Sequence, residues 1–312
     1  MSKILAVTEF YNEATNIPGL VESVSKQTTR PDAWLIINDG STDASVAIFT
    51  EMLEKHNFSY ILHEMPPKPK PDANMKGVAF QDIDLLNPDE RAKSKYDFVA
   101  KLDADSRLPA YYIEICLNIM NWFPEIGVMA GRIIGESGGA IPMGTGKIVR
   151  WNIIQATSRN YWDLDPDTLW NIKSVMHGYR LLIVEDLLLA VTRPTQISGP
   201  RGIYDYGRRM YYIRTHPLLV LNEAISLFFK RGSPIQFLRG YFHEKAIAEW
   251  RCEDPDVQYF YGLKNRLLYK LGLLPKMERT LITKVGIEHE SEEVLTPQKL
   301  QSIKETLKRK LQ

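Results

Sequence analysis

Apolar runs and helical periodicities alternate along the first part of the chain. Residues 3–8 (KILAVT) form a short apolar run that ends in polar residues, and 14–27 then place apolar side chains on one helix face. The unit recurs as the apolar run 34–37 and an amphipathic segment from about 43 to 55, before a third apolar run at 58–62. Strands that alternate with helices imply right-handed crossovers and a covered parallel sheet. We therefore predict that the first half is α/β.

A proline-rich stretch interrupts this alternation. Four prolines fall within residues 64–76, and proline cannot donate a backbone hydrogen bond and biases its neighbours toward extended conformations. We therefore predict a long surface loop there. Regularity returns with an apolar strand at 96–102, which runs into the motif Asp103-Ala104-Asp105 and precedes a predicted helix at 109–122.

The remainder of the chain is predicted to be mainly helical. A strand at 127–134 leads into the glycine-rich stretch 135–146, after which the segments 218–229 and 235–250 have the apolar spacing of amphipathic helices. The charge-rich tail from residue 288 is typical of a solvated helix.

Composition excludes several classes of protein. A length of 312 residues fits one large domain or two ordinary ones. With 39 basic and 38 acidic residues, the chain lacks the basic footprint of a nucleic-acid binder. Cys116 and Cys252 make no CxxC pair, which excludes a disulfide scaffold or structural zinc site and favours a reducing compartment. The N-terminus turns polar too soon for a signal peptide, and no apolar run approaches the ~18 residues of a membrane span. A cytoplasmic location is expected.

Acidic residues follow three of the predicted strands. They occur within Glu9–Glu13, within Asp39–Asp43 and in Asp103-Ala104-Asp105. Because the carboxyl ends of parallel strands line one crevice, we expect these loops to converge on a ligand site. Gathered carboxylates repel one another unless a cation or a polyhydroxyl ligand satisfies them. Mg²⁺ or Mn²⁺ bridging a diphosphate meets that requirement, since both prefer oxygen ligands.

These motifs carry a resemblance to a known family. The segments FYNEATNIPGLVESVSKQT, LIINDGSTDAS and FVAKLDADSRLP, spread in order over residues 3–135, resemble family 2 glycosyltransferases. Members of that family are inverting enzymes of the GT-A fold that use nucleotide sugars. The resemblance implies a Rossmann-like α/β sandwich with a mainly helical C-terminal part, and a UDP- or GDP-sugar as donor.

The resemblance also implies roles for particular residues. Four residues after the first strand are implied to surround the nucleoside: Glu9, Phe10, Tyr11 and Glu13. Asp39 is implied to contact the base or ribose, and Asp103 and Asp105 to hold the ribose and the metal, Mg²⁺ or Mn²⁺. Asp105 is our choice of direct ligand, because Asp103 lies nearer the strand and alternates to the other face. Lys101 shares the face of Asp103 and either pairs with it or is a solvated charge.

The acceptor base is sought in the second half of the chain. The segment YWDLDPDTLWNIKSVMHGYR resembles a stretch of one branch of the family that reads W-D-T-[IL]-D-E before a helix and a G-[WY]-[KR] turn. Aligning Gly178-Tyr179-Arg180 with that turn puts Asp167-Thr168 on the family's D-T. It puts Trp170-Asn171 where the family has an acidic pair that supplies the presumed base.

Three alternatives follow from this departure. Asp167 or Asp165 serves as the base, Glu185-Asp186 serves instead, or catalysis is weak. We favour Asp167, although Asp-Pro-Asp at a helix start is also typical of a cap. Asp186 remains the second candidate.

The segment AVTRPTQ resembles the branch's H-R-P-T motif and extends the resemblance to about residue 220. Thr192 stands where a histidine is usual, and in many relatives that histidine assists metal binding. Its absence weakens the inference of a metal. Arg193 is retained and either faces phosphate or is exposed to solvent, which is the more common situation for an arginine.

Residues 216–247 combine two apolar-faced helices with basic residues, among them Lys230, Arg231 and Arg239. One interpretation is an interfacial helix pair in peripheral contact with the inner face of the membrane, which would favour a lipid-linked acceptor. The other is a helical subdomain packed on the sheet, with a glycan or other soluble acceptor.

The sequence thus predicts a GT-A domain over 1–215, with a nucleotide-binding half over about 1–135 and an acceptor half over about 136–215, followed by a helical region over 216–312. The predicted function is transfer of a sugar from a nucleotide donor to an acceptor hydroxyl, with inversion and with help from a metal. One alternative is a catalytically weak relative that binds nucleotide sugars. The other is a hydrolase using Ser137, whose G-x-S-x-G motif is not followed by a helix.

Overall fold

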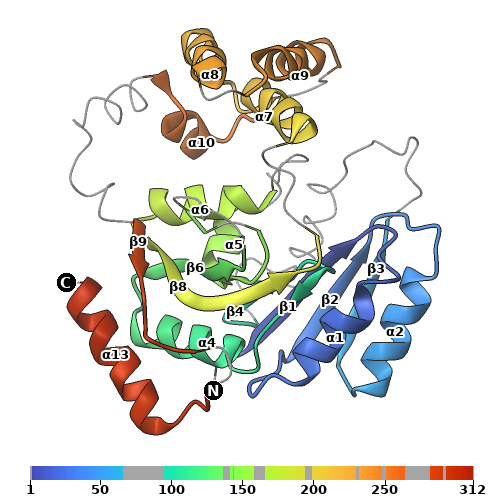
Figure 1. The fold of residues 1–312 in the computed structure, drawn as a ribbon, viewed down its shortest axis with the longest axis vertical. Coiled ribbons are helices and arrows are strands. Elements are labelled where there is room, and N and C mark those ends of the chain that lie inside the picture. Colours follow the sequence, from blue (N-terminus) through green and yellow to red (C-terminus); the bar gives the residue numbers. More distant parts are fainter. Residues whose placement is uncertain are drawn as a thin grey trace.

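The structure is a computed structural model that describes residues 2–65, 95–135, 141–142, 144–157, 166–193, 199–229, 232–247, 251–263, 282–290 and 293–311. Within these ranges the side chains of Pro166, Asp167 and Ile282 are not described. Most of the proline-rich stretch and the motif around Ser137 lie outside the described residues. A sheet with helices on both faces forms the body of the protein, and a group of helices stands at one end (Figure 1).

The sheet has the order β3-β2-β1-β4-β7-β6-β8-β5, and β9 pairs with β8. Its first part contains the parallel strands β1 (Ile4–Phe10), β2 (Ala33–Asn38), β3 (Tyr60–Glu64) and β4 (Phe98–Lys101). Its second part contains β5 (Ser106–Arg107), β6 (Ile126–Ile133), β7 (Lys147–Arg150), β8 (Arg180–Val191) and β9 (Ile282–Val285). The strands expected at 3–8, 34–37, 58–62, 96–102 and 127–134 are confirmed.

Two hydrophobic clusters cover the two faces of the sheet. Along β1, Ile4 and Ala6 belong to one cluster and Leu5 and Val7 to the other, because successive side chains of a strand point to opposite faces. The first cluster includes residues of α1 (Ile17–Ser25), α2 (Ser45–Lys55), α4 (Tyr112–Trp122) and α13 (Pro297–Leu311). The second includes residues of α5 (Trp151–Thr157) and α6 (Pro166–Met176).

The sheet as a whole is mixed, although its first four strands are parallel as predicted. Strand β7 pairs antiparallel with β4 on one side and with β6 on the other, so the sheet is not parallel throughout. The remainder of the chain is mainly helical, as predicted, but it also contributes the strands β7, β8 and β9 to the sheet. Strand β7 is short, and only Ile148 and Val149 lie between its charged ends, which leaves little periodicity to detect.

Helix α13 is not fully solvated, which corrects the expectation of a solvated helix in the charge-rich tail. Its side chains Ile303, Leu307 and Leu311 are buried and belong to the cluster that covers one face of the sheet. The rest of its surface is charged, which made its sequence resemble that of a solvated helix.

The remaining helices form a separate layer beyond α6 (Figure 1). They are α7 (Pro200–Tyr212), α8 (Pro217–Phe229), α9 (Pro234–Ile247) and α10 (Pro255–Phe260). A Cβ added at Gly207 would lie 1.9 Å from the Phe237 carbonyl oxygen, and one at Gly240 would lie 1.9 Å from that of Tyr204. The backbones of α7 and α9 are therefore in direct contact, which only glycine permits at these positions.

A buried ionic cluster attaches this layer to α6. Lys173 Nζ lies 2.5 Å from Asp254 Oδ2 and 2.7 Å from Asp256 Oδ2, with the lysine side chain 6% exposed. Burial lowers the pKa of Lys173, but hydrogen bonds and charges from the two aspartates more than offset this and raise its pKa overall. None of the helices described is long and apolar enough to cross a membrane.

Candidate functional site

The loops after β1 and β2 are tied together at the carboxyl edge of the sheet. Asn12 adopts a left-handed conformation with φ of 53°, and its Oδ1 accepts a 2.8 Å hydrogen bond from the Thr42 amide. The Asn12 amide donates to Ser41 Oγ, and the Glu13 amide donates to Ser45 Oγ at 2.7 Å. These bonds hold the first acidic loop against the second.

Glu13 is buried, with 8% of the residue exposed. Its Oε2 accepts a 2.8 Å hydrogen bond from Asn16 Nδ2. Asp39 is also buried, at 1% exposed, and its amide donates to the Phe10 carbonyl. The ring of Phe10 lies in the core with its centroid 5.3 Å from that of Phe49, so the loop presents Tyr11 rather than Phe10 toward solvent.

The third acidic loop follows β4. Lys101 Nζ lies 2.7 Å from Asp103 Oδ1, so of the two alternatives for Lys101 the structure has the ion pair. The Asp103 amide donates a 2.8 Å hydrogen bond to the hydroxyl of Thr145, which is itself buried. Ser106 Oγ donates to the Asp103 carbonyl oxygen at 2.6 Å. The backbone of the D-x-D motif is therefore fixed from both sides.

Arg193 brings the first and third loops together. Its Nη2 lies 2.5 Å from Glu13 Oε1 and its Nε lies 3.2 Å from Asp105 Oδ2. The preceding residue, Thr192, donates from its amide to the Asp105 carbonyl oxygen and from its hydroxyl to Asn16 Oδ1 at 2.8 Å. The segment after β8 thus returns to the carboxyl edge and closes a polar cluster around two carboxylates.

The pKa of Asp105 depends on its burial and on the charges around it. Burial, followed by the negative charge of Asp103, raises the pKa of the Asp105 carboxyl, while the charge and hydrogen bond of Arg193 act in the opposite direction. Burial lowers the pKa of Arg193, but its bonds to Glu13 and Asp105 raise it overall. The guanidinium of Arg193 therefore stabilises the ionised form of Asp105.

The residues of the D-x-D motif fit a hard divalent cation. Asp103 and Asp105 supply carboxylate oxygens, the ligands that Mg²⁺ and Mn²⁺ prefer, and the raised pKa of Asp105 marks a position where added positive charge is stabilising. Across the part of the chain that the structure describes, no group of three or more His, Cys, Asp or Glu residues forms a metal cage. Mg²⁺ sites commonly use one or two carboxylates and complete their coordination with substrate phosphates and water.

The two residues that the sequence aligns with the family's acidic pair are buried packing residues in this structure. Trp170 is fully buried, and Asn171, 2% exposed, donates from Nδ2 to the Pro142 carbonyl oxygen at 2.8 Å. Asp165 lies outside the described residues, while Asp167 is the second residue of α6. Asp186 accepts hydrogen bonds from the amides of Ile287 and His289, which attach the segment after β9 to β8.

Three residues of this cluster were not identified from the sequence. Asn12 lies inside a motif that was singled out, and asparagine is one of the few residues that tolerates a left-handed conformation. Asn16 and Thr145 carry no such signal, because their partners lie far along the chain: Asn16 bonds Thr192, and Thr145 bonds Asp103.

The chain is similar to several known proteins. Residues 6–69 match the family model described as glycosyl transferase family 2. Teichoic acid poly(glycerol phosphate) polymerase of Staphylococcus epidermidis is 25% identical over 121 residues, which is 39% of this chain but only 15% of that protein.

Among solved structures, the mannosyltransferase PcManGT of Pyrobaculum calidifontis, in complex with GDP-Man and Mn²⁺, has a TM-score of 0.52 at 17% identity, covering 89% of this chain and 82% of that chain. TarS 1–349 of S. aureus, in complex with UDP, has a TM-score of 0.47 at 14% identity, covering 67% of this chain and 64% of that chain. The shared architecture with the mannosyltransferase confirms the predicted fold. Residues 6–69 are thus similar to glycosyltransferase family 2, and the fold of the chain is GT-A.

Proposed function

We propose that the protein transfers a sugar from a nucleotide diphosphate donor, a UDP- or GDP-sugar, to an acceptor hydroxyl with inversion at the anomeric carbon. Mg²⁺ or Mn²⁺ assists the reaction. The observation that carries this proposal is the meeting of Glu13, Asp105 and Arg193 at the carboxyl edge of the sheet. A nucleotide sugar combines hydroxyl groups that carboxylates bind with a diphosphate that needs positive charge, and this cluster offers both.

Different loops contact different parts of the donor. Glu9, at the end of β1, and Tyr11 and Asp39, on the loops after β1 and β2, surround the nucleoside. Asp103 faces the ribose while Lys101 holds its carboxylate. Arg193 has a side chain that is 58% exposed, so it can reach a bound diphosphate without leaving the cluster. Asp105 and Asp103 would hold the metal, which supplies positive charge for the diphosphate that leaves.

Inversion needs a base on the side of the sugar opposite the leaving diphosphate. The base removes the proton of the acceptor hydroxyl as that oxygen bonds to the anomeric carbon and the bond to the diphosphate breaks. We assign this role to Asp167, since the carboxylate of Asp186 already accepts backbone hydrogen bonds. The division into a domain over 1–215 and a helical region over 216–312 is part of the same proposal.

A nucleotide-sugar-binding protein with weak catalysis is the second candidate. Buried Trp170 and Asn171 replace the expected acidic pair, and Thr192 replaces the expected histidine. Both departures remove groups that assist turnover while leaving the nucleoside loops intact.

A thermal-shift screen of UDP-, GDP- and dTDP-sugars, each with and without Mn²⁺, tests the proposal. A ligand that binds only the folded state raises its stability by RT ln(1 + [L]/Kd), so the true donor is expected to raise the melting temperature more when Mn²⁺ is present. Release of free nucleotide from that donor then distinguishes a transferase from a binder. If no nucleotide sugar changes the melting temperature, the proposal fails.

Arg193→Gln is expected to lower the affinity for the donor's nucleoside diphosphate by about tenfold or more, because a charge-assisted hydrogen bond contributes roughly 1.5–3 kcal/mol. Arg193→Lys is expected to recover part of the loss, since lysine keeps the charge but not the planar fork of donors. Calorimetric titration with UDP and GDP measures both. Arg201→Gln is the matched control, because Arg201 is exposed and its ion pair with Asp205 lies within α7. Equal affinity in Arg193→Gln and Arg201→Gln would contradict a phosphate contact.

A further inference from the structure

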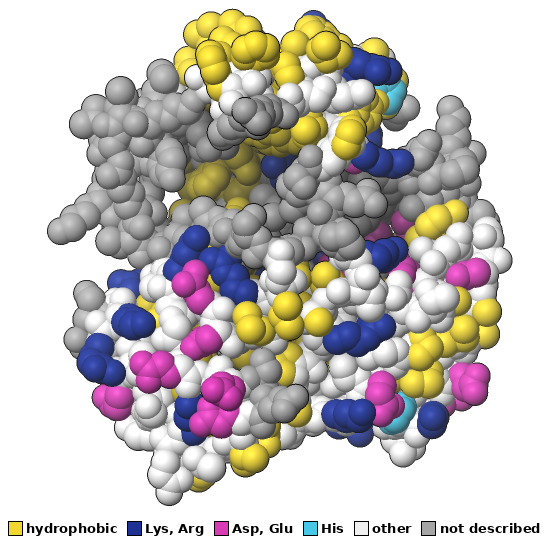
Figure 2. All heavy atoms as spheres, in the orientation of Figure 1, with side chains coloured by type: hydrophobic (Ala, Val, Ile, Leu, Met, Phe, Trp, Pro, Cys, Tyr) yellow, Lys and Arg dark blue, Asp and Glu magenta, His cyan; other side chains and the backbone are white. Residues whose placement is uncertain are grey.

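The outer surface of α8 and α9 exposes a continuous set of large apolar side chains. On α8 they recur at the spacing of one helix face and are Leu218, Leu221, Ile225, Phe228 and Phe229. On α9 they are Ile235, Phe242 and Ile247. Phe228 is 69% exposed and Phe229 is 78% exposed, which is far from the burial normal for phenylalanine. Figure 2 shows hydrophobic side chains gathered over these two helices at the top of the molecule.

The inner faces of the same helices are already packed, so the exposed set is not an unfinished core. Val220 and Ala224 of α8 and Phe237 of α9 are buried in one cluster with Met210 of α7. The glycine contacts between α7 and α9 fix the orientation of α9. The interfacial interpretation of 216–247 thus gains support for the outer face, while Phe237 alone among the four phenylalanines of these helices is a core residue.

The fully exposed charges that the structure describes on this surface are basic. The exposed charged residues of α8 and α9, as the structure describes them, are Arg239 and Lys245. The acidic Glu244 is buried, and its Oε2 lies 2.8 Å from Arg208 Nε. Glu223 is only partly exposed. A partner for this surface must therefore combine an apolar layer with negative charge.

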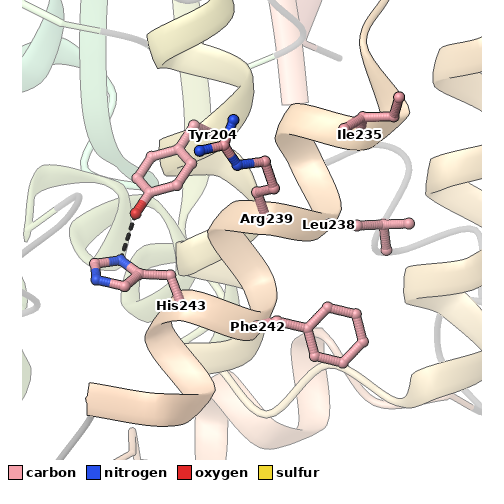
Figure 3. Close-up of a pocket in the computed structure, with 6 residues that line it drawn as sticks. All are labelled: Tyr204, Ile235, Leu238, Arg239, Phe242 and His243. Atoms are coloured by element: carbon pink, nitrogen blue, oxygen red, sulfur yellow. Dashed lines mark hydrogen bonds between the residues drawn. The ribbon is translucent and has the colours of Figure 1, made fainter.

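An open cavity of about 570 Å³ lies in the same surface, lined by Tyr204, Ile235, Leu238, Arg239, Phe242 and His243. Figure 3 shows Ile235, Leu238 and Phe242 projecting from one side of α9, with the Tyr204 hydroxyl hydrogen-bonded to His243 Nδ1. Apolar walls beside an arginine suit a phosphate attached to hydrocarbon chains.

We propose that the outer surface of α8 and α9 is a peripheral membrane-binding surface that docks on a bilayer containing anionic lipids, with Arg239 facing lipid phosphate. Amphipathic helices bind such bilayers by burying aromatic and aliphatic side chains at the headgroup boundary while basic residues contact anionic headgroups. A second copy of the chain fits less well, because a two-fold contact through this surface would bring Arg239 and Lys245 toward the same residues of the partner.

Sedimentation of the full chain with vesicles tests the proposal without any need for turnover. Binding to vesicles of phosphatidylcholine with phosphatidylglycerol is expected, with weaker binding at high salt and to phosphatidylcholine alone. The double variant Phe228→Ser with Phe229→Ser is expected to bind at least tenfold more weakly. Because both rings are largely exposed, the melting temperature should stay unchanged, which separates lost binding from misfolding.

Two matched controls remove similar groups elsewhere. Val294→Ser deletes an apolar side chain that is 65% exposed before α13 and is expected to bind vesicles like the parent. Arg239→Gln with Lys245→Gln should reduce the salt dependence, whereas Lys308→Gln should not. If the parent stays in the supernatant with anionic vesicles at low salt, or if the phenylalanine variant binds like the parent, the proposal is overturned. A concentration-dependent dimer lost in that variant, without vesicle binding, would also overturn it. Failure on vesicles would leave the proposed sugar transfer untouched.

Discussion

Asp105→Ala is expected to lower metal-dependent donor turnover on the order of a thousandfold, because a direct metal ligand contributes several kcal/mol of transition-state stabilisation. The carboxylate lies beside Asp103 and Arg193, in a position where burial raises its pKa and the charge of Arg193 lowers it. Steady-state rates with the identified donor, measured across a range of Mn²⁺ concentrations, give the effect.

Asp105→Asn is the matched variant, since it keeps the shape of the side chain and removes only the charge. We expect it to lose most of the activity that the alanine variant loses, while both keep the parent's fold by circular dichroism. Glu51→Gln removes a carboxylate from the exposed side of α2 and should change nothing. Parental activity in Asp105→Ala would remove the metal role from this residue.

Asp167→Asn is expected to lower kcat by about a hundredfold or more with nucleotide affinity nearly unchanged, because loss of a general base affects the transition state rather than donor binding. The variant isolates the charge, since asparagine keeps the size of the side chain. Measurements of kcat with the acceptor, alongside calorimetric titration with nucleotide, separate the two quantities.

Asp186→Asn provides the contrast. Its carboxylate accepts backbone hydrogen bonds from Ile287 and His289, so the substitution is expected to lower the melting temperature and leave kcat largely intact. If Asp186→Asn instead lowers kcat at unchanged stability, the register that aligned Asp167 with the family's motif is wrong.

The first half of the fold could be predicted because its signals are local. The apolar runs of β1 and β2 are each followed by a segment with helical periodicity. This pattern predicts the strands and the helices, and it also predicts that the strands run parallel. Because the carboxyl ends of parallel strands lie at the same edge of the sheet, the loops that contain Glu13 and Asp105 were expected near each other. Strand alternation placed Lys101 on the face of Asp103 but left open whether the two pair, which the structure decides.

The rest of the fold depends on contacts between segments that lie far apart in the sequence, and no local pattern predicts these contacts. Strand β7 joins the sheet between β4 and β6, and four residues bounded by glycine and a helix carry no periodicity that specifies this position. Thr145 lies next to Asp103 because β7 pairs with β4, and no sequence motif indicates this contact. The outer face of α8 has the same apolar spacing as a core-facing helix, and only its exposure in the fold distinguishes the two.

The bridge from Arg193 to Glu13 joins residues 180 positions apart, which bears on the order in which the site forms during synthesis. Domains tend to fold as units, with N-terminal parts emerging first at roughly 5–20 residues per second. When β1, β2 and β4 have left the ribosome, Glu13 and Asp105 can approach each other, but the guanidinium that joins them has not been translated. A nascent chain that ends before β8 therefore has two unbridged carboxylates, and the donor site that we propose is complete only after that strand and Arg193 have been added.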